Sequence, residues 1–196
     1  MTHSRLAVLA SVLCLSAAAW PARALAIGFG VEGGAAVTYA NTPASASGVV
    51  SNAAGSANLG LMVENTFNIA VVFLDLWADV QTPLRLQTGG ADAAKYVPID
   101  LGLRLGLTLG PIQPYAGILG QLAINTDAGG GPALSSPIFG IGGDVGLDIA
   151  LFIFRFGVEL RGVETVSNLY ESSSIRADNG GSAFELEGLA SVRLSF

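Results

Sequence analysis

The sequence predicts an all-β chain that folds as an eight-stranded, antiparallel, up-and-down transmembrane β-barrel. Apolar and polar residues alternate along eight segments, which is the period of a strand with one apolar and one polar face. Mean hydropathy is +0.57 and 51% of residues are hydrophobic. Yet beyond the amino terminus no apolar run approaches the ~18 to 20 residues that a spanning helix needs. Long and short connections between the segments also alternate.

The first residues of the chain have the pattern of a secretory signal peptide, which we expect to span residues 1–26. Arg5 supplies the positive charge, Leu6 to Ala19 the apolar stretch, and Ala24-Leu25-Ala26 a small-x-small cleavage site. Cleavage between Ala26 and Ile27 is therefore predicted. The alternative, an uncleaved anchor helix, is disfavoured because the apolar stretch is short and is followed by Pro21.

Removal of this segment would leave a single domain, residues 27–196, with a restricted chemistry. His3 and Cys14, the only His and Cys of the chain, would leave with it. Disulfides, thiolate nucleophiles, imidazole bases and histidine metal sites are thereby excluded, and no cofactor is expected. The net charge would fall from −6 to −8, which disfavours a nucleic-acid partner because phosphate binding needs a basic surface.

The first half of this domain is expected to form four strands, with the clearest alternation in the fourth. There, every second residue is aliphatic and every residue between is small, polar or Pro; the aliphatic set is Val97, Ile99, Leu101, Leu103, Leu105, Leu107 and Leu109. The four predicted strands are 27–39, 57–64, 69–81 and 97–109. A short turn is predicted at 65–68, and long loops rich in Ser, Ala, Gly and Pro at 41–56 and 82–95.

The second half repeats the arrangement, with predicted strands at 115–125, 138–149, 154–163 and 182–196. Short turns follow the fourth and sixth strands, and long loops are expected at 126–137 and 167–181. In an antiparallel meander this alternation places every long loop at one end and both termini with the short turns at the other. Outer-membrane barrels show this asymmetry together with an even number of strands.

Aromatic residues gather near the predicted strand ends, as interfacial girdles would. We expect one group at the turn end and one at the loop end, although strand ends of any β protein can carry aromatics. The turn-end group is Phe29, Phe67, Tyr115, Phe152, Phe154 and Phe196, and the loop-end group is Tyr39, Tyr96, Tyr170 and Phe184.

Residues 27–196 resemble the outer-membrane β-barrel domain family, the small eight-stranded barrels of Gram-negative bacteria. The most family-like pieces are Pro114-Tyr115-Ala116-Gly117, the glycine-rich run Gly140 to Gly146, and the terminal Leu194-Ser195-Phe196. The resemblance implies a location in the cell outer membrane, contact with outer-membrane lipid, and recognition of the final aromatic Phe196 by the barrel-assembly machinery. A monomer is expected. Family likeness does not assign an activity.

No catalytic residues are predicted. The acyl-transfer and hydrolytic chemistries known for small barrels commonly use a His base, which residues 27–196 lack. A Ser–Lys pair would have to use Lys95, the sole lysine, beside a predicted loop. Glu185 and Glu187 could formally act as a carboxylate pair, but strand parity favours them as lining of the barrel interior.

Charged residues predicted to face the interior are the main candidate site. Strand parity assigns to it the acids Glu32, Glu64, Asp75, Asp79, Asp100, Asp144, Asp148, Glu159, Glu185 and Glu187 and the arginines Arg104, Arg155, Arg161 and Arg193. Because four arginines cannot match ten acids, the sequence favours a hydrated, cation-attracting interior over a dry, ion-paired one. Alternatively, the excess acids lie near the rims in bulk water. Asp148 and Arg155 are expected to face each other across the third short turn.

Inward glycines permit two interpretations. They could leave space for water or a thin ligand, or they could make room for large side chains such as Phe73 and Trp77.

Three functions remain in consideration. The preferred one is a non-enzymatic structural or surface protein whose four long loops face the exterior. The second is a narrow, cation-preferring pore. The third is a soluble lipocalin-like binding barrel, which would turn the leucine row at 97–109 inward and the charges outward.

Overall fold

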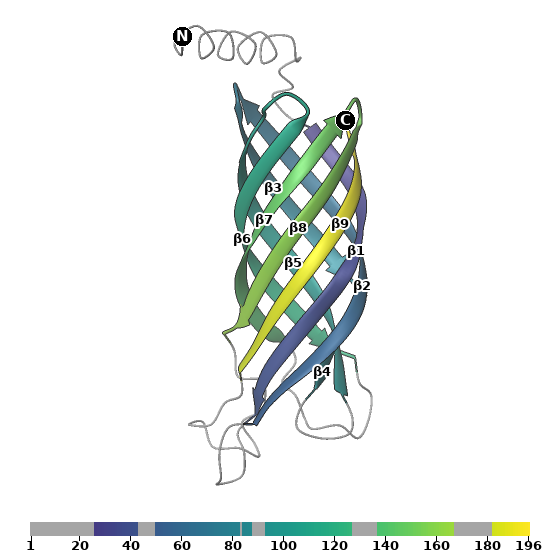
Figure 1. Cartoon of the computed structure of the whole chain (residues 1–196), viewed down its shortest axis with the longest axis vertical. Helices are drawn as coiled ribbons and strands as arrows, with labels where there is room; N and C mark the ends of the chain where they lie inside the picture. Colours follow the sequence, from purple (N-terminus) through teal and green to yellow (C-terminus); the bar gives the residue numbers. More distant parts are fainter. Residues whose placement is uncertain (1–25, 43–49, 83, 88–92, 127–136, 167–181) are drawn as a thin grey trace, which may run out of the picture.

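The chain forms a closed antiparallel β-barrel, seen in a computed structural model that describes residues 26–42, 50–82, 84–87, 93–126, 137–166 and 182–196 (Figure 1). Nine strands occur within these ranges: β1 (Ala26–Thr42), β2 (Val50–Ile69), β3 (Val72–Gln81), β4 (Leu84–Gln87), β5 (Ala93–Leu107), β6 (Ile112–Asn125), β7 (Ile138–Leu151), β8 (Phe154–Thr165) and β9 (Ser182–Ser195). No helix in the described ranges is long and apolar enough to cross a bilayer.

β3 and β4 occupy one position in the barrel, so the wall has the predicted eight strands. Both pair with β5, but Val80 lies opposite Ile99 whereas Leu84 lies opposite Tyr96. The register therefore shifts by one residue between Val80 and Leu84. Apart from the closing pair β1 and β9, all other neighbours in the wall follow one another in the chain, and the predicted meander is confirmed.

The seam between the first and last strands closes the barrel. β1 pairs with β9 from Gly28 opposite Ser195 to Asn41 opposite Ser182. Beyond that ladder the Ile27 amide donates to the Phe196 carbonyl at 3.1 Å, and the Phe196 amide donates to the Ile27 carbonyl at 2.9 Å. The chain end thus belongs to the wall, and closure removes the exposed sheet edge that an open sheet would present.

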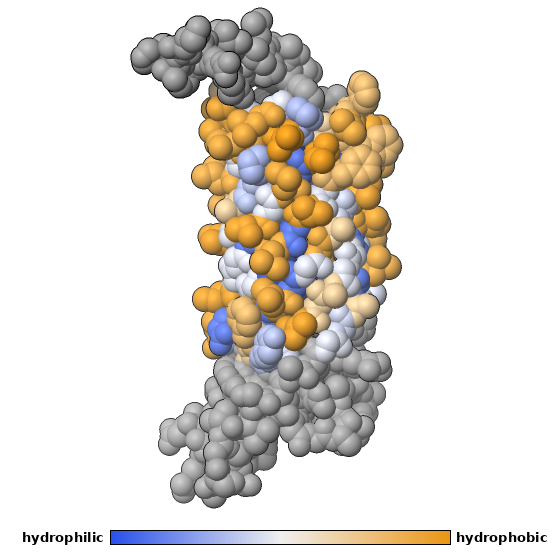
Figure 2. All heavy atoms as spheres, in the orientation of Figure 1, coloured by the Kyte–Doolittle hydropathy of each residue, from blue (hydrophilic) through white to orange (hydrophobic). Residues whose placement is uncertain are grey.

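Apolar side chains cover the outer wall. In the leucine row of β5, Leu101 and Leu105 are each 60% exposed, whereas Arg104, which lies between them in the chain, is 0% exposed. Figure 2 shows apolar residues spread over the visible face of the wall. The soluble lipocalin-like alternative required the opposite orientation of this row, and it is therefore wrong.

Inward glycines make room for large side chains rather than for empty space. A Cβ at Gly102 would overlap the Trp77 ring, one at Gly106 would overlap Phe73, and one at Gly146 would overlap Tyr115. The second interpretation of the glycines is confirmed. An eight-stranded barrel has an interior just wide enough to be filled by side chains, so each bulky residue needs a missing Cβ opposite it.

Three short turns join the strands at one end of the barrel. Each has two residues between the paired strands, Ala70-Val71, Gly110-Pro111 and Phe152-Ile153. The first residue of each has a positive φ: 57° at Ala70, 67° at Gly110 and 59° at Phe152. The turn predicted at 65–68 is wrong, because these residues continue β2. Thr66 there points inward and donates a hydrogen bond to Asp75 at 2.7 Å.

Strands extend further into the predicted long loops than alternation indicated. Residues 50–56 continue β2 and pair with residues 36–42 of β1, and residues 84–87 pair with residues 93–96. The Ser, Ala and Gly content of residues 50–56 hides the strand there, because pairing with β1, rather than an apolar face, specifies it. The rest of the four predicted loops lies almost entirely outside the described residues.

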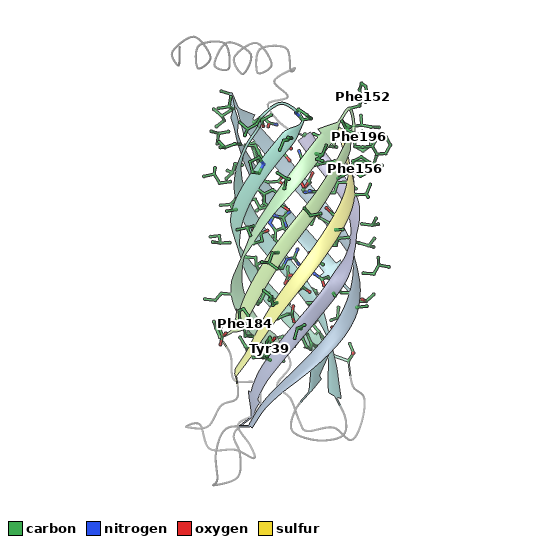
Figure 3. All side chains as sticks on the ribbon, in the orientation of Figure 1. Tyr39, Phe152, Phe156, Phe184 and Phe196 are labelled. Atoms are coloured by element: carbon green, nitrogen blue, oxygen red, sulfur yellow. The ribbon has the colours of Figure 1, made fainter. Side chains whose placement is uncertain are left out.

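The aromatic groups are only partly as predicted. Phe29, Phe67, Phe152, Phe154 and Phe196 are exposed at the turn end, and Tyr39 and Phe184 at the other end, where they pair across the seam. Figure 3 shows Phe152 and Phe196 at the turn end and Tyr39 and Phe184 at the opposite end. Tyr115 and Tyr96, assigned to the same groups, are instead 7% and 5% exposed because they point into the barrel. Tyr170 lies outside the described residues.

The glycine packing gives a first prediction. Gly102→Leu would force a side chain into the volume of the Trp77 ring, and such overpacking should lower the free energy of unfolding by about 1–3 kcal/mol. The matched control is Gly120→Leu, because Gly120 faces outward and a Cβ there meets nothing within 4 Å. Urea unfolding of the reconstituted protein measures both. Equal effects at the two positions would contradict the packing role of Gly102.

Candidate functional site: the charge network inside the barrel

Fourteen charged residues, ten acids and four arginines, were predicted to face the interior, and the structure places all of them there in the described part of the wall. The four arginines are between 0% and 6% exposed, and nine of the acids are equally buried. The tenth, Glu159, has a side chain that is 6% exposed. The fourteen residues come from every strand except β4 and β6. Strand parity alone brings them together, since alternate residues of each strand face the same side.

Nearest the turns lies a group built on Arg155 and Arg193. Both guanidinium groups bind Glu64, with Arg155 Nη1 3.0 Å from Oε1 and Arg193 Nη1 2.7 Å from Oε2. Arg193 also pairs with Asp148. Arg155 Nη1 lies 3.7 Å from Asp75, and its Nε lies 4.0 Å from Asp148. Asp148 and Arg155 therefore do face each other, although Arg193 is the closer partner of Asp148.

In the middle of the barrel, Arg104 is held by charge and by aromatic faces. Its Nε and Nη2 each lie 2.5 Å from a carboxylate oxygen, of Asp144 and Glu159 respectively. Tyr115 also donates its hydroxyl hydrogen to Glu159 at 2.8 Å. The guanidinium carbon lies 4.1 Å from the centroid of the Trp77 ring, within the range of a cation–π interaction.

Arg161 is the most heavily shared cation. Its Nη1 lies 2.7 Å from Asp100 and 2.8 Å from Asp79, two residues that face each other on β5 and β3. Further carboxylates lie within 4 Å of this guanidinium, namely Glu159 at 3.0 Å, Glu187 at 3.5 Å and Glu32 at 3.7 Å. Its guanidinium carbon also lies 4.6 Å from the centroid of the Trp77 ring, so Trp77 contacts both Arg104 and Arg161.

Toward the loop end, neutral polar side chains donate hydrogen bonds to Glu185 and Glu187. Glu187 accepts hydrogen bonds from Asn58 at 2.7 Å and from Gln81 at 3.3 Å. Glu185 accepts one from the Tyr96 hydroxyl and one from Gln121 at 3.4 Å. Asn58 and Gln121 were not predicted as site residues because only charged residues were considered, and Tyr96 was assigned to the outer aromatic group instead. Their inward strand parity was the signal that could have found them.

The interior is therefore more densely packed than predicted. Each of the ten acids has an arginine within 4 Å or a hydrogen bond from a neutral side chain, and an apolar cluster of Met62, Trp77, Leu119 and Val163 fills part of the cross-section. The prediction of a hydrated interior is wrong for this part of the chain. It rested on the numbers of arginines and acids alone, whereas Arg161 by itself contacts five carboxylates.

The carboxylates of the described interior are engaged by arginines and by neutral hydrogen-bond donors. Among the described residues, no group of His, Cys, Asp or Glu has the geometry to hold a metal ion. Glu185 and Glu187, the formal carboxylate pair, are each engaged by two neutral side chains. The side chain of Lys95 lies outside the described part of the structure. What the network does chemically is to neutralise charge inside a wall that is apolar on its outside.

The remaining predicted positions lie at the chain ends. Ala26 opens β1, and residues 1–25 lie outside the described part, so cleavage after Ala26 stays a prediction. Ile27 and Phe196 are paired at the seam, with the Phe196 ring 60% exposed on the outer wall. Recognition of Phe196 during assembly likewise stays a prediction.

Comparison with known proteins yields similarity to solved structures. Neisserial surface protein A is 17% identical, with a TM-score of 0.46 over 86% of this chain and 97% of that one. The outer membrane protein OprG from Pseudomonas aeruginosa is 18% identical, with a TM-score of 0.49 over 86% of this chain and 95% of that one. These similarities concern the fold. No protein-family model and no curated protein matches the chain.

The shared guanidinium gives a second prediction. Arg161→Met would leave five buried carboxylates without their common cation and should lower the free energy of unfolding by about 3–5 kcal/mol. In that background Asp100→Asn should recover part of the loss, because it removes one of the stranded charges. Urea titrations of the two single variants and the double variant measure the coupling.

Glu164→Gln is the matched control for these variants, because Glu164 is an exposed residue of the same strand, β8. It should change the free energy of unfolding by no more than about 0.5 kcal/mol. Strictly additive effects of Arg161→Met and Asp100→Asn would show that the two residues do not share a network.

Proposed function

We propose that this chain is a non-enzymatic β-barrel protein of the Gram-negative cell outer membrane, with a structural or surface role. The observation that carries the proposal is the polarity of the wall: apolar side chains outside, and paired charges inside. A protein in water would reverse this arrangement, because its apolar face would be buried in the core. Lipid contact explains the exposed leucine row without requiring any other partner.

Backbone hydrogen bonding supports the same proposal. In hydrocarbon every backbone amide and carbonyl must be paired within the protein, and a closed barrel satisfies this where an open sheet cannot. The seam between β1 and β9, extended by Ile27 and Phe196, provides the closure. The predicted signal peptide is consistent with export to the cell envelope.

A surface or structural role is favoured over transport because the interior is filled. Trp77, Arg104 and Arg161 lie together across the middle of the barrel and are at most 1% exposed. Permeation would require several ion pairs to break at once. We therefore propose that the barrel acts as a stable platform for its four loop connections, which are directed to the cell exterior.

The second candidate is the narrow cation-preferring pore. Ten interior acids against four arginines favour it, since any path that opened would be strongly cation-attracting. In this candidate Arg104 and Arg161 would have to leave Trp77 for ions to pass.

The proposed partners are those of a membrane barrel. They are outer-membrane lipid along the wall and the barrel-assembly machinery during biogenesis, and the protein is proposed to be a monomer. The exposed ring of Phe196 at the last position of the seam is consistent with recognition of this residue before closure.

Conductance distinguishes the two candidates. The protein reconstituted in a planar bilayer, with insertion verified, should give no reproducible current steps, because the paired charges and Trp77 obstruct the interior. Arg104→Ala removes part of the obstruction and should introduce small, cation-selective steps. Cation-selective steps from the unmodified protein, altered by Arg104→Ala, would favour the pore instead.

Lipid exposure of the wall gives a further prediction. Leu103 lies at the centre of the leucine row, so Leu103→Arg should lower the free energy of unfolding in vesicles by about 2–4 kcal/mol. The same change at Val97, at the loop end of the row, should cost at most about 1 kcal/mol. Urea unfolding in phosphatidylcholine vesicles measures the difference. Equal costs at both positions would argue against a membrane-embedded wall.

A further inference from the structure

The three short turns lack polar side chains. The turns and the residues that flank them are Ile69 to Val72, Leu109 to Ile112 and Leu151 to Phe154, and each of these residues is apolar, Gly or Pro. Together with Phe196, which lies at the same end, they form what we call the turn rim. The Ser195 amide donates to the carbonyl of Ile153, which fixes the chain end beside the third turn. Figure 3 shows Phe152, Phe156 and Phe196 gathered there.

These side chains project away from the barrel. Phe152 is 101% exposed and Ile69 is 75% exposed, more than any other large apolar residue in the described ranges. Turns that emerge into water are usually rich in Gly, Asn, Asp and Ser. The turn rim therefore has the composition of a buried surface, although nothing else in the described part of the chain covers it.

The geometry of the third turn does not explain its phenylalanine. Phe152 has a φ of 59°, a region that suits Gly or Asn and that is unfavourable for a bulky side chain. At the equivalent place in the second turn the chain has Gly110, with a φ of 67°. A small or polar residue would fit this backbone conformation better than Phe152 does. The apolar ring at 152 therefore indicates that it contacts another surface.

The opposite end of the wall differs in polarity. Exposed polar residues lie there at the ends of three strands: Thr82 directly follows β3, Thr126 directly follows β6, and Glu164 is the last residue but one of β8. An exposed carboxylate and hydroxyls are compatible with bulk water or lipid head groups. The two ends of the barrel are thus adapted to different surroundings. Among the described residues, the apolar outer surface continues through the turns at the turn end, whereas exposed polar residues lie at the opposite end.

The height of the wall indicates what surrounds the rim. The leucine row runs from Val97 to Leu109, which is about 40 Å along a strand and about 30 Å along the axis for a tilt near 40°. The apolar band of an outer-membrane barrel is about 25 Å tall. The wall therefore has apolar surface left over, and the turn rim continues it without a polar break.

We propose that the turn rim is a lipid-binding surface, inserted in the leaflet at the turn end of the barrel with the Phe152 ring among acyl chains. The proposal rests on the membrane location proposed above. A shallow apolar groove lies beside the rim on the outer wall, lined by Phe29, Gly30, Val31, Phe154, Val192 and Leu194. It is continuous with the rim through Phe154, and its apolar lining suits an acyl chain. The turns then remain below the lipid surface instead of emerging into water.

Site-directed labelling tests the proposal in the full chain. With Cys14→Ser, a single introduced cysteine can carry an environment-sensitive fluorophore. Phe152→Cys reports on the rim, Leu101→Cys on the middle of the wall, and Thr126→Cys on the opposite end. In phosphatidylcholine vesicles carrying spin-labelled lipids, the label at 152 should be quenched by a nitroxide high on the acyl chain and not by aqueous iodide. The label at 126 should show the reverse.

The control at 101 separates the two proposals. If the label at 101 is quenched by a deep nitroxide while that at 152 is quenched by iodide, the wall is in lipid and the rim proposal is overturned. If the label at 101 is also quenched by iodide, the membrane location itself fails. Shielding of the label at 152 from both quenchers would overturn the rim proposal in favour of a protein partner or a second copy of the chain.

A substitution gives a second test, in which the direction of the change in stability distinguishes the two explanations. Phe152→Asn supplies a residue suited to positive φ, so a purely structural turn should be stabilised by it. If the ring contacts lipid, the substitution should instead lower the ratio of folded to unfolded protein in vesicles about fivefold. Glu164→Gln, at the opposite end of the wall, is the control and should leave the ratio nearly unchanged. A ratio that rises with Phe152→Asn would overturn the proposal.

Discussion

Closure of the backbone ladder between β1 and β9 is the constraint on which the rest of the structure depends. A closed wall leaves no strand edge, and it also fixes the width of the interior, since eight strands leave a space that side chains fill. Every later feature follows from this width. Phe73, Trp77 and Tyr115 fit because the residues facing them are glycines, and an arginine such as Arg161 can reach several strands at once. A wider barrel would allow water to solvate the same charges separately.

The narrow interior makes the charge network costly but specific. Buried ion pairs repay their desolvation only when their geometry is good, and hydrophobic replacements are often as stable. Their value here lies in register. A slip of one residue along a strand that contributes to the network would move an arginine or a carboxylate to the lipid side and apolar residues to the inside. Arg161, which contacts acids from five strands, ties the register of those strands to one point.

How far the sequence predicts this fold depends on what specifies each segment. The row from Val97 to Leu109 is predicted well because one face of the strand requires apolar residues and the other does not. The alternation of residue types therefore shows the strand directly. Residues 50–56 were missed because their strand is specified by pairing with β1, which leaves no apolar pattern. Residues 65–68 were assigned to a turn from their composition, whereas the hydrogen bond from Thr66 to Asp75 makes polar residues suitable for an inward strand face.

The sequence predicts the composition of the interior better than it predicts which interior side chains interact. Strand parity assigned every charged residue of the network to the correct side of the wall, because odd and even positions of a strand face opposite sides. Counting then failed, because a ratio of ten acids to four arginines says nothing of distances. Arg161 lies where five carboxylates converge, and neutral donors such as Tyr96 and Asn58 satisfy acids that have few cations nearby. Only the three-dimensional register of the closed barrel decides which side chains share a guanidinium. The sequence therefore predicts the two faces of this wall, while the closed geometry determines that the inner one is a packed network.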